Sequence, residues 1–511
     1  MTDTTHTSWA GSGFLHLLGQ KASENPERIY ASELVNGVWQ DHTIGSVQAR
    51  ALTIAAGLSA RGVGRGDRVG LMLGTHVDTS AAAFALGLLG AVWVPVGLRQ
   101  VASGVTYTVT EADVTLLIVE EEAEEVARTA GCDVLVRPQD AGLCAALGEA
   151  PAITPVLPEA EDLCMILFTS GTTGRPKAVP LTHAMLRYSA ESAAISSQAE
   201  PGAIYYTWEP FHHIGGAQVV VLPLIRDVQL ALTAKFTASG FWDQVRACGA
   251  TRIHHLGGVL QMLLKQPARP DDKEHQVAIA WGGGCDTETW KASEARFGLR
   301  ITEGYGMTEA SSLSTVNVEG LPGYVGRALP WFEVSIRDRD GRVLATGERG
   351  EIVVTPRPDC ETALFKGYMN SVEATREALR DGRLHTGDMG SLDAEGRLKF
   401  HGRMKDTIRV RGENVSAWEV EHVVEQHDAV AACAAIPVEA EIGEADIKIY
   451  VQSAPGQTLT GAALFDWLAG KLAPHQLPQF ITFVQEFERT PSQRIMKHKL
   501  DATRAGDWTR H

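Results

Sequence analysis

Short β-branched segments alternate with helical stretches through most of this chain, and no other feature constrains its fold as strongly. Such alternation is typical of α/β layers built on largely parallel sheets. The candidate strands are Val69–Leu73, Val114–Val119, Met165–Thr169 and Thr251–Leu256, and the candidate helices are Ala51–Ala60, Ala184–Ala194 and Thr287–Phe297.

The segment Ala81–Leu98 is apolar enough to raise the question of a membrane span. Glycines and Pro95 interrupt it, which is unusual for a spanning helix. We therefore expect a buried helix at Ala81–Leu89 followed by a buried strand at Ala91–Val96.

A chain of 511 residues is too long for one hydrophobic core, so more than one domain is expected. Towards the C-terminus, Gly390–Gly402 is typical of a hairpin, and a helix is expected from Ser416 to about His427. We predict an α/β fold in two parts. Residues 1–404 form a large N-terminal domain of layered α/β subdomains with a β-rich subdomain. Residues 405–511 form a small mobile α+β C-terminal domain.

The formal net charge is −16, from 46 basic and 62 acidic residues. An acidic surface argues against nucleic acid or an anionic membrane as the main partner. The seven cysteines form no CxxC pair, so a disulfide framework or a zinc site is not expected. The N-terminus has no basic start followed by an apolar run. We expect a cytoplasmic protein with no nucleic-acid and no membrane partner.

A loop rich in hydroxyl groups and glycine follows the candidate strand that ends at Thr169. Small residues let the backbone fold tightly, with N–H and O–H donors converging on phosphate oxygens, and a terminal lysine adds a counter-charge. The loop lacks the Gly-Lys-Ser/Thr ending of a Walker A motif. The alternative is a surface turn without a ligand. The candidate phosphate-binding residues are Thr169, Ser170, Gly171, Thr172, Thr173, Gly174 and Lys177.

This loop resembles the signature of the adenylate-forming superfamily, which contains acyl-CoA synthetases, luciferases and peptide-synthetase adenylation domains. Further motifs of that family follow in order over nearly the whole chain. They are Pro210–Gly216, Trp281–Gly284, Tyr305–Glu309, Thr386–Asp388, Gly402–Asp406 and Gly412–Val415. Taken singly, several of these motifs are ordinary glycine turns or solvated residues. Together they identify an acyl-CoA synthetase with an acyl-adenylate site.

The resemblance implies a role for each matching residue at the nucleotide. Tyr305 stacks on adenine, Thr308 contacts the α-phosphate, and Glu309 holds Mg²⁺ if ATP is used. These roles suit an aromatic face, a hydroxyl and a hard carboxylate oxygen. The family's remaining nucleotide positions correspond to Gly283 and Gly284 beside adenine, Asp388 on the ribose and Arg403 on ribose or phosphate.

The same resemblance implies where the acyl group and CoA bind. The family positions that line the acyl pocket correspond to Trp281, Gly282, Gly306 and His212, and His212 lies where the acyl pocket meets the pantetheine tunnel. Lys405 corresponds to the hinge between domains, and Gly412 to the turn that lets pantetheine pass. An aspartate that holds an amino group in peptide-synthetase domains is missing from the Pro210–Gly216 region, which disfavours amino acid substrates.

One family motif departs from the pattern. The family's catalytic lysine near the C-terminus falls at Arg494, in the run Pro491–Lys497. That lysine bridges the substrate carboxylate and the α-phosphate while ATP is attacked. Arginine keeps the charge, but its planar fork is bulkier and not equivalent at a tight site. Thioester formation, for which the lysine leaves the site, should tolerate the change.

Three hypotheses follow. In the first, the chain converts preformed acyl-AMP and CoA into acyl-CoA, and a separate adenylating enzyme supplies the adenylate. In the second, Arg494 or Lys497 replaces the lysine, and the chain is a complete ATP-dependent, AMP-forming ligase of a carboxylic acid and CoA. In the third, it is a binding-only relative that senses an acyl-adenylate or nucleotide.

Under the first hypothesis the chain resembles the non-adenylating CoA ligases of platensimycin/platencin-type diterpenoid pathways. That resemblance implies a bulky terpenoid acid as the acyl group and a role in secondary metabolism. Dimers are common in the superfamily, so the resemblance also suggests a homodimer.

Overall fold

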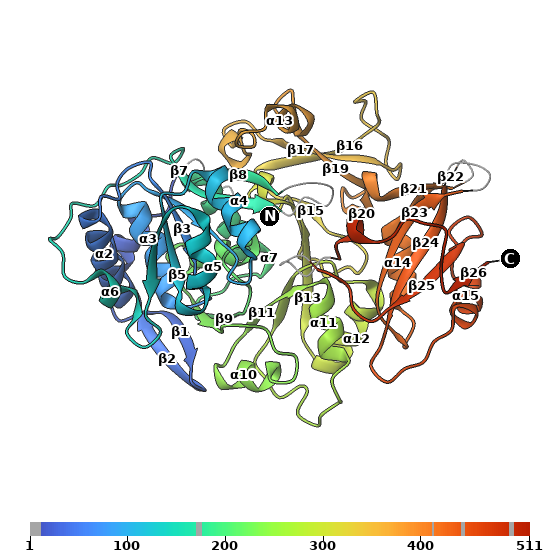
Figure 1. The fold of residues 1–511 in the computed structure, drawn as a ribbon, viewed down its shortest axis with the longest axis horizontal. Helices are drawn as coiled ribbons and strands as arrows, with labels where there is room; N and C mark the ends of the chain where they lie inside the picture. Colours follow the sequence, from blue (N-terminus) through green and yellow to red (C-terminus); the bar gives the residue numbers. More distant parts are fainter. Residues whose placement is uncertain (1–11, 170–175, 411–412, 441–444, 490–494, 511) are drawn as a thin grey trace. The chain divides into compact units, whose positions relative to one another are not determined.

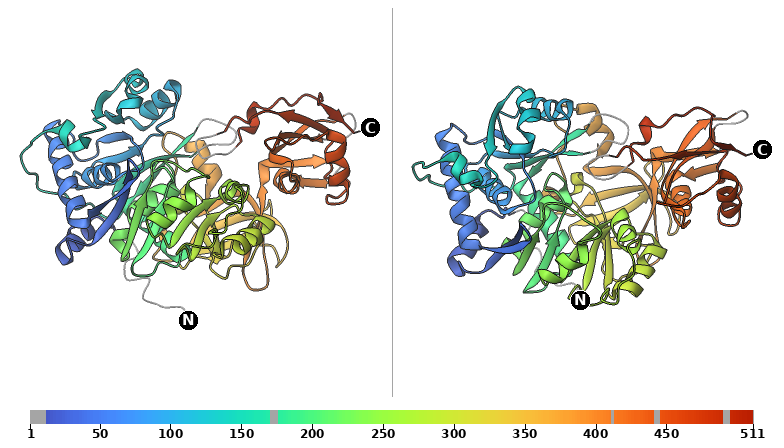
Figure 2. Two further views of the ribbon diagram at one scale, coloured as in Figure 1. Left: turned by 90° about the horizontal axis from the view of Figure 1, so that it is seen from below. Right: turned by 60° about the horizontal axis from the view of Figure 1, so that its bottom comes forward.

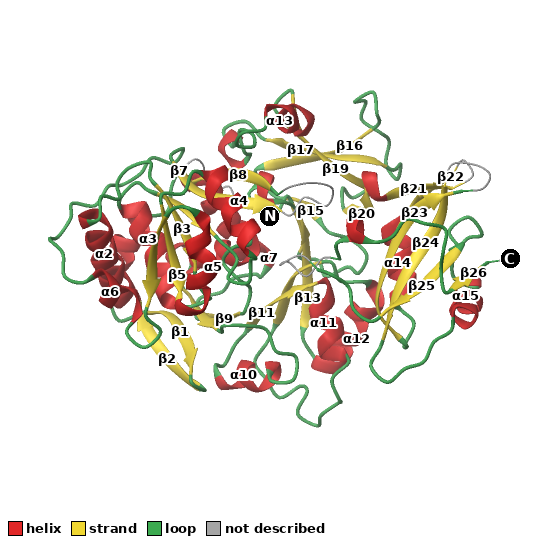
Figure 3. Ribbon diagram, in the orientation of Figure 1, coloured by secondary structure: helices red, strands yellow, loops and turns green. Residues whose placement is uncertain are grey.

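The computed structural model describes residues 12–169, 176–410, 413–440, 445–489 and 495–510. The chain divides into two compact units (Figures 1 and 3). Unit 1 comprises Met1–Thr169, Pro176–Val334 and Val354–Leu384, and unit 2 comprises Ser170–Arg175, Ser335–Val353 and His385–His511.

Unit 1 contains a six-stranded sheet. Its strands are parallel, apart from one edge strand that is antiparallel to its neighbour. Its strands, in spatial order, are β6 (Asp133–Arg137), β5 (Leu116–Glu120), β3 (Arg68–Met72), β4 (Val92–Pro95), β7 (Leu163–Thr169) and β8 (Lys177–Thr182). One face packs on α4 (Ala102–Ala112) and α5 (Glu124–Ala127). The other packs on α2 (Ile44–Ala60), α3 (Val77–Leu88) and α6 (Gly142–Leu147). Figure 1 shows these helices around β3 and β5.

A nine-stranded sheet forms the rest of the unit 1 core. Its strands, in spatial order, are β15 (Arg327–Ala328), β14 (Thr315–Asn317), β13 (Arg300–Tyr305), β12 (Ile279–Gly283), β11 (Arg252–Leu256), β9 (Ala203–Thr207), β10 (Val228–Leu232), β1 (Ile29–Val35) and β2 (Val38–Thr43). The strands from β13 to β1 are parallel, and the outer ones are antiparallel. One face is covered by α10 (Phe241–Ala247), α11 (Gly257–Leu264) and α12 (Thr287–Phe297).

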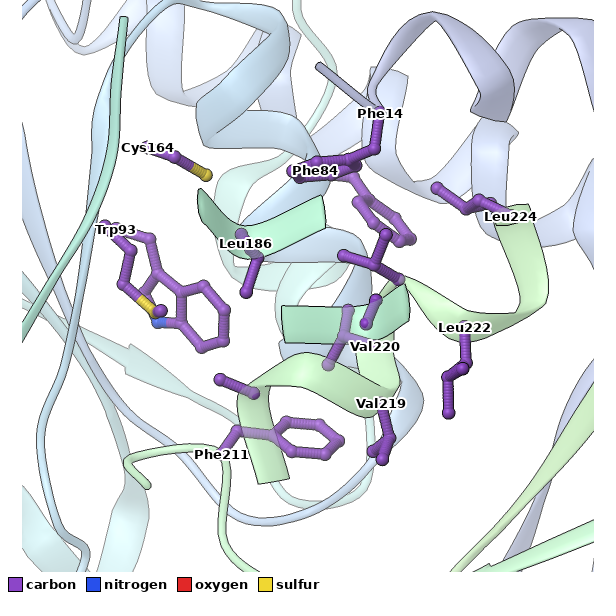
Figure 4. Close-up of a cluster of buried hydrophobic side chains, with 14 of the residues drawn as sticks. Phe14, Phe84, Trp93, Cys164, Leu186, Phe211, Val219, Val220, Leu222 and Leu224 are labelled. Atoms are coloured by element: carbon purple, nitrogen blue, oxygen red, sulfur yellow. The ribbon is translucent and has the colours of Figure 1, made fainter. Parts of the chain in front are cut away.

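Helix α7 (His183–Ser196) is buried on nearly every side, as expected of a helix in the interior of a large unit. One continuous core cluster contains residues of α7 and of both sheets. Figure 4 shows Leu186 of α7 near Trp93 of β4 and Phe211. The shorter helices α1 (His16–Glu24), α8 (Ile214–Ala217) and α9 (Leu222–Ile225) add to this cluster. The sheets of unit 1 therefore share one hydrophobic core.

A five-stranded sheet follows along the chain. Its strands are β16 (Phe332–Arg337), β17 (Gly350–Pro356), β19 (Arg383–Leu392) and β18 (Leu379–Arg380), with β20 (Leu398–Arg403) paired to β19. Helix α13 (Val372–Ala378) precedes β18. The expected hairpin is formed by β19 and β20, and its turn is closed by a hydrogen bond from Gly396 N to Asp393 O of 3.0 Å.

Unit 2 contains a four-stranded sheet and a separate two-stranded ribbon. The sheet consists of β23 (Val430–Glu439), β24 (Ala445–Ser453), β25 (Phe480–Val484) and β26 (Trp508–Thr509), and the ribbon of β21 (Thr407–Val410) and β22 (Glu413–Ser416). Two helices, α14 (Ala417–Glu425) and α15 (Gly461–Ala469), complete its core. Figure 2 shows this unit in two further orientations. The α+β character expected of the C-terminal part is confirmed, and the domain boundary at residues 404 and 405 stays a prediction.

The predicted strands and helices of unit 1 are present, with shifted ends. Helix α12 has the predicted bounds because Asp286 caps its first turn and Gly298 ends it in the left-handed region. Helix α2 begins at Ile44 instead of Ala51, because the side chain of Thr43 accepts a hydrogen bond from Ser46 N. Within the described part of the chain, no helix is both long and apolar enough to cross a membrane.

A buried carboxylate joins three elements around the six-stranded sheet. Asp78, at the start of α3, accepts hydrogen bonds from Arg50 of α2, from Arg137 Nε of β6 at 2.8 Å and from Leu143 N of α6 at 3.0 Å. Burial alone would raise the pKa of Asp78, but these donors outweigh it and lower the pKa to about 2. The ionised form is therefore the one that stabilises this region.

We expect Asp78→Asn to lower the free energy of unfolding of unit 1 by about 3 kcal/mol, because it removes the buried negative charge that pairs with both Arg50 and Arg137. The wild-type contribution should be complete above about pH 4 and should disappear as the pH falls towards 2. Urea unfolding followed across this pH range measures both effects. Asp113→Asn, at a largely exposed carboxylate beside Arg68, is the matched control and should change stability by less than about 0.5 kcal/mol. An equal loss in both variants would contradict this account.

Candidate functional site

The carboxyl ends of the central strands of the nine-stranded sheet lie at one edge, because β9, β11, β12 and β13 are parallel. Open α/β sheets bind ligands at this edge. Four groups of chemically suitable residues occur here. They are Thr207–Glu209 after β9, His254–Leu256 in β11, Trp281–Gly283 in β12 and Tyr305 at the end of β13.

Glycines at the end of β12 allow its backbone to lie very close to the backbones of β11 and β13. A Cβ on Gly282 would lie 1.8 Å from His255 O of β11, and one on Gly283 would lie 3.2 Å from Gly304 O of β13. Gly284 has φ +82°. The predicted glycine stretch is therefore the tightly packed end of β12 together with Gly284, which we call the glycine turn, and its role beside adenine stays a prediction.

A buried glutamate lies beneath this turn and was not singled out in the sequence. Glu303 Oε1 accepts a hydrogen bond from Cys285 N at 2.5 Å, and Glu303 pairs with Gly282 across β12 and β13. Burial raises the pKa of Glu303 to about 8. Glu303 consequently ties the glycine turn to the neighbouring strand.

The Tyr305–Glu309 motif forms a second turn at the same edge. A Cβ on Gly306 would lie 2.0 Å from Ser312 O, so this position requires glycine. Thr308 and Glu309 lie in a single 3₁₀ turn, Thr308–Ala310, and are largely buried, as is Tyr305. The predicted base-, phosphate- and cation-binding residues are thus presented from one short segment.

Tyr368 joins two of the predicted site residues, and sequence reasoning missed it. Its hydroxyl donates a 2.7 Å hydrogen bond to Glu309 Oε1, and Lys177 Nζ lies 4.7 Å from the centroid of its ring. Burial and the adjacent Glu309 carboxylate raise the pKa of Tyr368 above its usual range, so the hydroxyl keeps its proton. Tyr368 is 59 residues from Glu309, and no local pattern marks it.

Only the two ends of the predicted phosphate loop lie within the described residues. Thr169 and Lys177 face each other across β7 and β8, and Thr169 Oγ1 donates to Lys177 O at 3.4 Å. The Tyr107 hydroxyl donates to Pro176 O at 2.8 Å. The other predicted loop residues, Ser170, Gly171, Thr172, Thr173 and Gly174, fall outside the described residues, and their role stays a prediction.

His212 lies in the loop between β9 and α8, and its ring centroid is 4.3 Å from that of His213. Burial, with a smaller contribution from His213, lowers the pKa of His212 to about 3, so the imidazole is neutral at neutral pH. Its Nε2 atom is buried and has no hydrogen-bond partner among the described residues, and a Cβ on Gly97 would lie only 3.3 Å from it. The predicted place of His212 at the pantetheine tunnel remains untested.

A small cavity lies at the same sheet edge and contains an ion pair that sequence reasoning missed. Glu209 and His254 line this cavity together with Trp281. Glu209 Oε2 is 2.7 Å from His254 Nδ1, and both side chains are buried. Trp281, predicted as an acyl-pocket residue, packs its ring 4.4 Å from that of His254.

Unit 2 brings together the predicted ribose residues. Asp388 of β19 pairs with Arg403 of β20, and Arg403 Nε lies 3.7 Å from Asp388 Oδ1. Asp388 N donates to Thr386 Oγ1 at 3.1 Å, and Gly387, within β19, has φ +68°. Asp388 itself is largely buried. The buried Asp388 carboxylate and the Arg403 guanidinium, the two groups predicted for the ribose, therefore lie next to each other.

The remaining predicted residues of this unit are less defined. Lys405, the predicted hinge, lies in the 3₁₀ turn Met404–Asp406 and is exposed. Gly412, of the predicted thioester turn, and Arg494, at the lysine position, fall outside the described residues. The interpretation of both therefore rests on the sequence.

Comparison with protein families decides the class. The sequence model of the AMP-binding enzyme family matches residues 18–369, and that of the AMP-binding enzyme C-terminal domain matches residues 419–494. The first match covers more than half of the chain. The chain belongs to the AMP-binding enzyme family.

Individual relatives of this AMP-binding enzyme agree with that assignment. The crotonobetaine/carnitine–CoA ligase of Salmonella typhi is 30% identical over 466 residues, covering 86% of this chain and 89% of that protein. The structure of Bacillus subtilis o-succinylbenzoate CoA synthetase with its acyl-adenylate intermediate has a TM-score of 0.84 at 25% identity, covering 96% of this chain and 98% of that one. ATP-bound MatB from Rhodopseudomonas palustris also has a TM-score of 0.84, at 26% identity, with coverage of 95% and 97%.

These relatives confirm the fold class and the activity class expected from the sequence. The chain has the mixed α/β fold of the adenylate-forming superfamily, with a large N-terminal and a small C-terminal part. It is an acid–thiol ligase of the AMP-forming acyl-CoA synthetase family.

We expect Gly306→Ala to weaken AMP binding at least about tenfold, because the new methyl group would displace the backbone that presents Tyr305 and Thr308. Isothermal titration calorimetry with AMP measures the effect. Gly64→Ala is the control, since a Cβ there meets open space and its φ is not left-handed. Unchanged AMP affinity in a folded Gly306→Ala protein would show that this turn does not bind the nucleotide.

Proposed function

We propose that this enzyme forms an acyl-CoA thioester from an acyl-adenylate and CoA, and that ATP-dependent adenylation is weakened or lost. The observation that carries the proposal is Arg494, which stands where the family has its catalytic lysine. A separate adenylating enzyme would then supply the acyl-adenylate.

The physical argument concerns the two anions that meet during adenylation. The substrate carboxylate must approach the α-phosphate of ATP, and a compact ammonium at the point of contact screens both charges. A guanidinium is wider, planar and restricted to a fork of N–H donors, so it does not fit the same point in the same way. Thioester formation starts from a neutral mixed-anhydride carbonyl and no longer needs this screening.

The neighbouring Lys497 is already engaged, which weakens the alternative that it replaces the missing lysine. Lys497 Nζ lies 2.6 Å from Glu421 Oε1 of α14, and Glu421 Oε1 also accepts a 2.6 Å hydrogen bond from Ala435 N. Burial raises the pKa of Glu421, although Lys497 partly offsets this. Moving Lys497 away would leave a buried carboxylate without its cation.

The other site residues would serve the adenylate. Tyr305 would contact adenine, while Asp388 and Arg403 would hold the ribose. Thr308 and Lys177, together with the loop Thr169–Gly174, would bind the phosphate. His212, Lys405 and Gly412 would act in the CoA step, in which residues 405–511 swing about Lys405 as a mobile C-terminal domain and Gly412 admits pantetheine.

Glu309 fits a magnesium site only in combination with a substrate. Its carboxylate is a hard oxygen ligand, and Glu309 lies in the same 3₁₀ turn as Thr308. Among the described residues, no group of three or more His, Cys, Asp and Glu side chains is arranged to hold a metal. Mg²⁺ usually binds through one or two carboxylates, water and substrate phosphates, so Glu309 would hold it if ATP is used. When bound, the cation would neutralise phosphate charge.

The acyl substrate is a carboxylic acid or its adenylate, since the ligases similar to this chain are named for crotonobetaine or carnitine and for o-succinylbenzoate. The bulky terpenoid acid suggested by the resemblance to diterpenoid-pathway ligases stays a prediction, as do the homodimer and the cytoplasmic location.

A complete ATP-dependent carboxylic acid–CoA ligase is the second candidate. The intact Glu309, and the ATP bound in the structure of MatB, favour this alternative. It differs from the first candidate in one measurable respect, the release of pyrophosphate from ATP.

We expect the wild-type enzyme to form thioester from synthetic acyl-AMP and CoA but to release little pyrophosphate from ATP with a panel of carboxylic acids. Arg494→Lys should raise the rate of pyrophosphate release at least about tenfold, because it restores the compact ammonium. Wild-type pyrophosphate release at a rate comparable to thioester formation would contradict the proposal. Failure to form thioester from any acyl-AMP would contradict both candidates and favour a binding-only role.

Lys497→Met distinguishes a catalytic from a structural role of Lys497. We expect it to lower the free energy of unfolding of unit 2 by about 2 kcal/mol, since it leaves Glu421 unpaired, and to leave pyrophosphate release unchanged. Urea unfolding and a pyrophosphate assay measure these effects. Lys499→Met removes the same charge from an exposed pair with Glu488 and should cost less than about 0.5 kcal/mol. A loss of pyrophosphate release in Lys497→Met alone would show that Lys497 performs the lysine's role.

A further inference from the structure

The cavity beside Glu209 and His254 lies next to the turns that the proposed function assigns to the adenylate. Glu209 follows β9, His254 lies in β11 and Trp281 lies in β12, one residue before Gly282. These strands are parallel neighbours, so their carboxyl ends place the three side chains at the same edge as Tyr305. A group in this cavity would therefore be close to the predicted acyl position.

The cavity combines an apolar wall with one charged pair. The apolar lining includes Trp281, Tyr205 and Val219, and Glu209 and His254 are the charged pair. Its volume is about 10 Å³, enough for about one water-sized group. The space suits the polar end of a longer chain and not a ring system.

Glu209 is ionised in this environment. Burial alone would raise its pKa, but His254, with a further contribution from His213, outweighs burial and lowers the pKa. His254 Nδ1 lies 2.7 Å from Glu209 Oε2, and neither atom forms a hydrogen bond with a described residue. The carboxylate thus remains an acceptor with capacity for a further donor.

A glycine leaves space beside the Glu209 carboxylate. A Cβ on Gly215 would lie 2.5 Å from Glu209 Oε2, so any larger residue would push the carboxylate aside. The main chain of His254 is held by a 3.1 Å hydrogen bond from Trp208 Nε1 to His254 O. A buried ion pair is not a strong stabiliser compared with apolar packing, so its position in a cavity that can take one small polar group points to recognition.

We propose that this cavity receives a hydrogen-bond-donating group on the acyl chain, a hydroxyl or an ammonium, and that Glu209 accepts the hydrogen bond. The inference rests on the proposed function, because it takes the acyl-adenylate as the ligand. The proposed substrates are acids that carry a hydrogen-bond donor towards the end of the acyl group. A purely hydrocarbon chain would gain no such hydrogen bond, so an acid that carries a donor should bind more tightly.

The test uses non-hydrolysable acyl-sulfamoyladenosines without CoA, which separates recognition of the acyl group from binding of pantetheine. Two matched series are compared by calorimetry. One contains benzoyl and its hydroxy and aminomethyl derivatives at each ring position, and the other contains unbranched acyl chains of three to eight carbons with and without a terminal hydroxyl or amine. We expect at least one donor-bearing member to bind about tenfold or more tightly than its unsubstituted partner.

The variants assign the preference to Glu209. Glu209→Leu should abolish it, whereas Glu209→Gln should keep the preference for hydroxyl and lose that for ammonium, because an amide accepts a hydrogen bond without a charge. Unsubstituted members should bind each variant with similar affinity, which also shows that the site is folded. Glu200→Gln, at a largely exposed carboxylate near Arg252, is the control and should leave every affinity unchanged.

Two results would overturn the inference and leave the proposed function intact. One is equal affinity within all matched pairs in the wild-type enzyme, and the other is a preference that Glu209→Leu does not alter. If no acyl-sulfamoyladenosine binds the wild-type enzyme, the proposed function itself is wrong, and the inference falls with it.

Discussion

The close approach of β11 and β12 is the constraint on which the rest of the site depends. No Cβ fits on Gly282, because His255 O of the neighbouring strand would lie within 1.8 Å of it. This contact brings the carboxyl end of β12 against that of β11, and the parallel register carries the alignment to β13. The glycine turn, Trp281 and the Tyr305–Glu309 segment are consequently presented at one edge. The Glu209–His254 pair lines the cavity there.

Much of this arrangement can be predicted from the sequence because it depends on local signals. Strands such as β7 and the helix α12 follow from β-branched runs and from the cap residue Asp286. Glycine at position 306 is predicted by its motif and explained by the nearby Ser312 O. The predicted helix end is wrong where the capping residue does not stand out in the sequence, as at Thr43 before α2.

The residues that sequence reasoning missed are those that depend on long-range packing. Tyr368 reaches Glu309 and Lys177 only because the segment after β17 returns to the sheet edge. Glu209 follows β9 and His254 lies in β11, and neither residue alone indicates a functional site. Their proximity at 2.7 Å is a property of strand order and register, which no single-sequence pattern contains. Motifs therefore identify the nucleotide site more readily than the acyl pocket.

The central claim is that the two half-reactions are unequal in this enzyme. Single-turnover kinetics on one preparation with one acyl group compares them directly, by the rate of thioester formation from acyl-AMP and CoA and the rate of adenylate formation from the acid and MgATP. Because Arg494 affects only adenylation, the account predicts that thioester formation is faster by at least about 10³-fold, or about 4 kcal/mol in activation free energy. Rates within about tenfold of each other would contradict it.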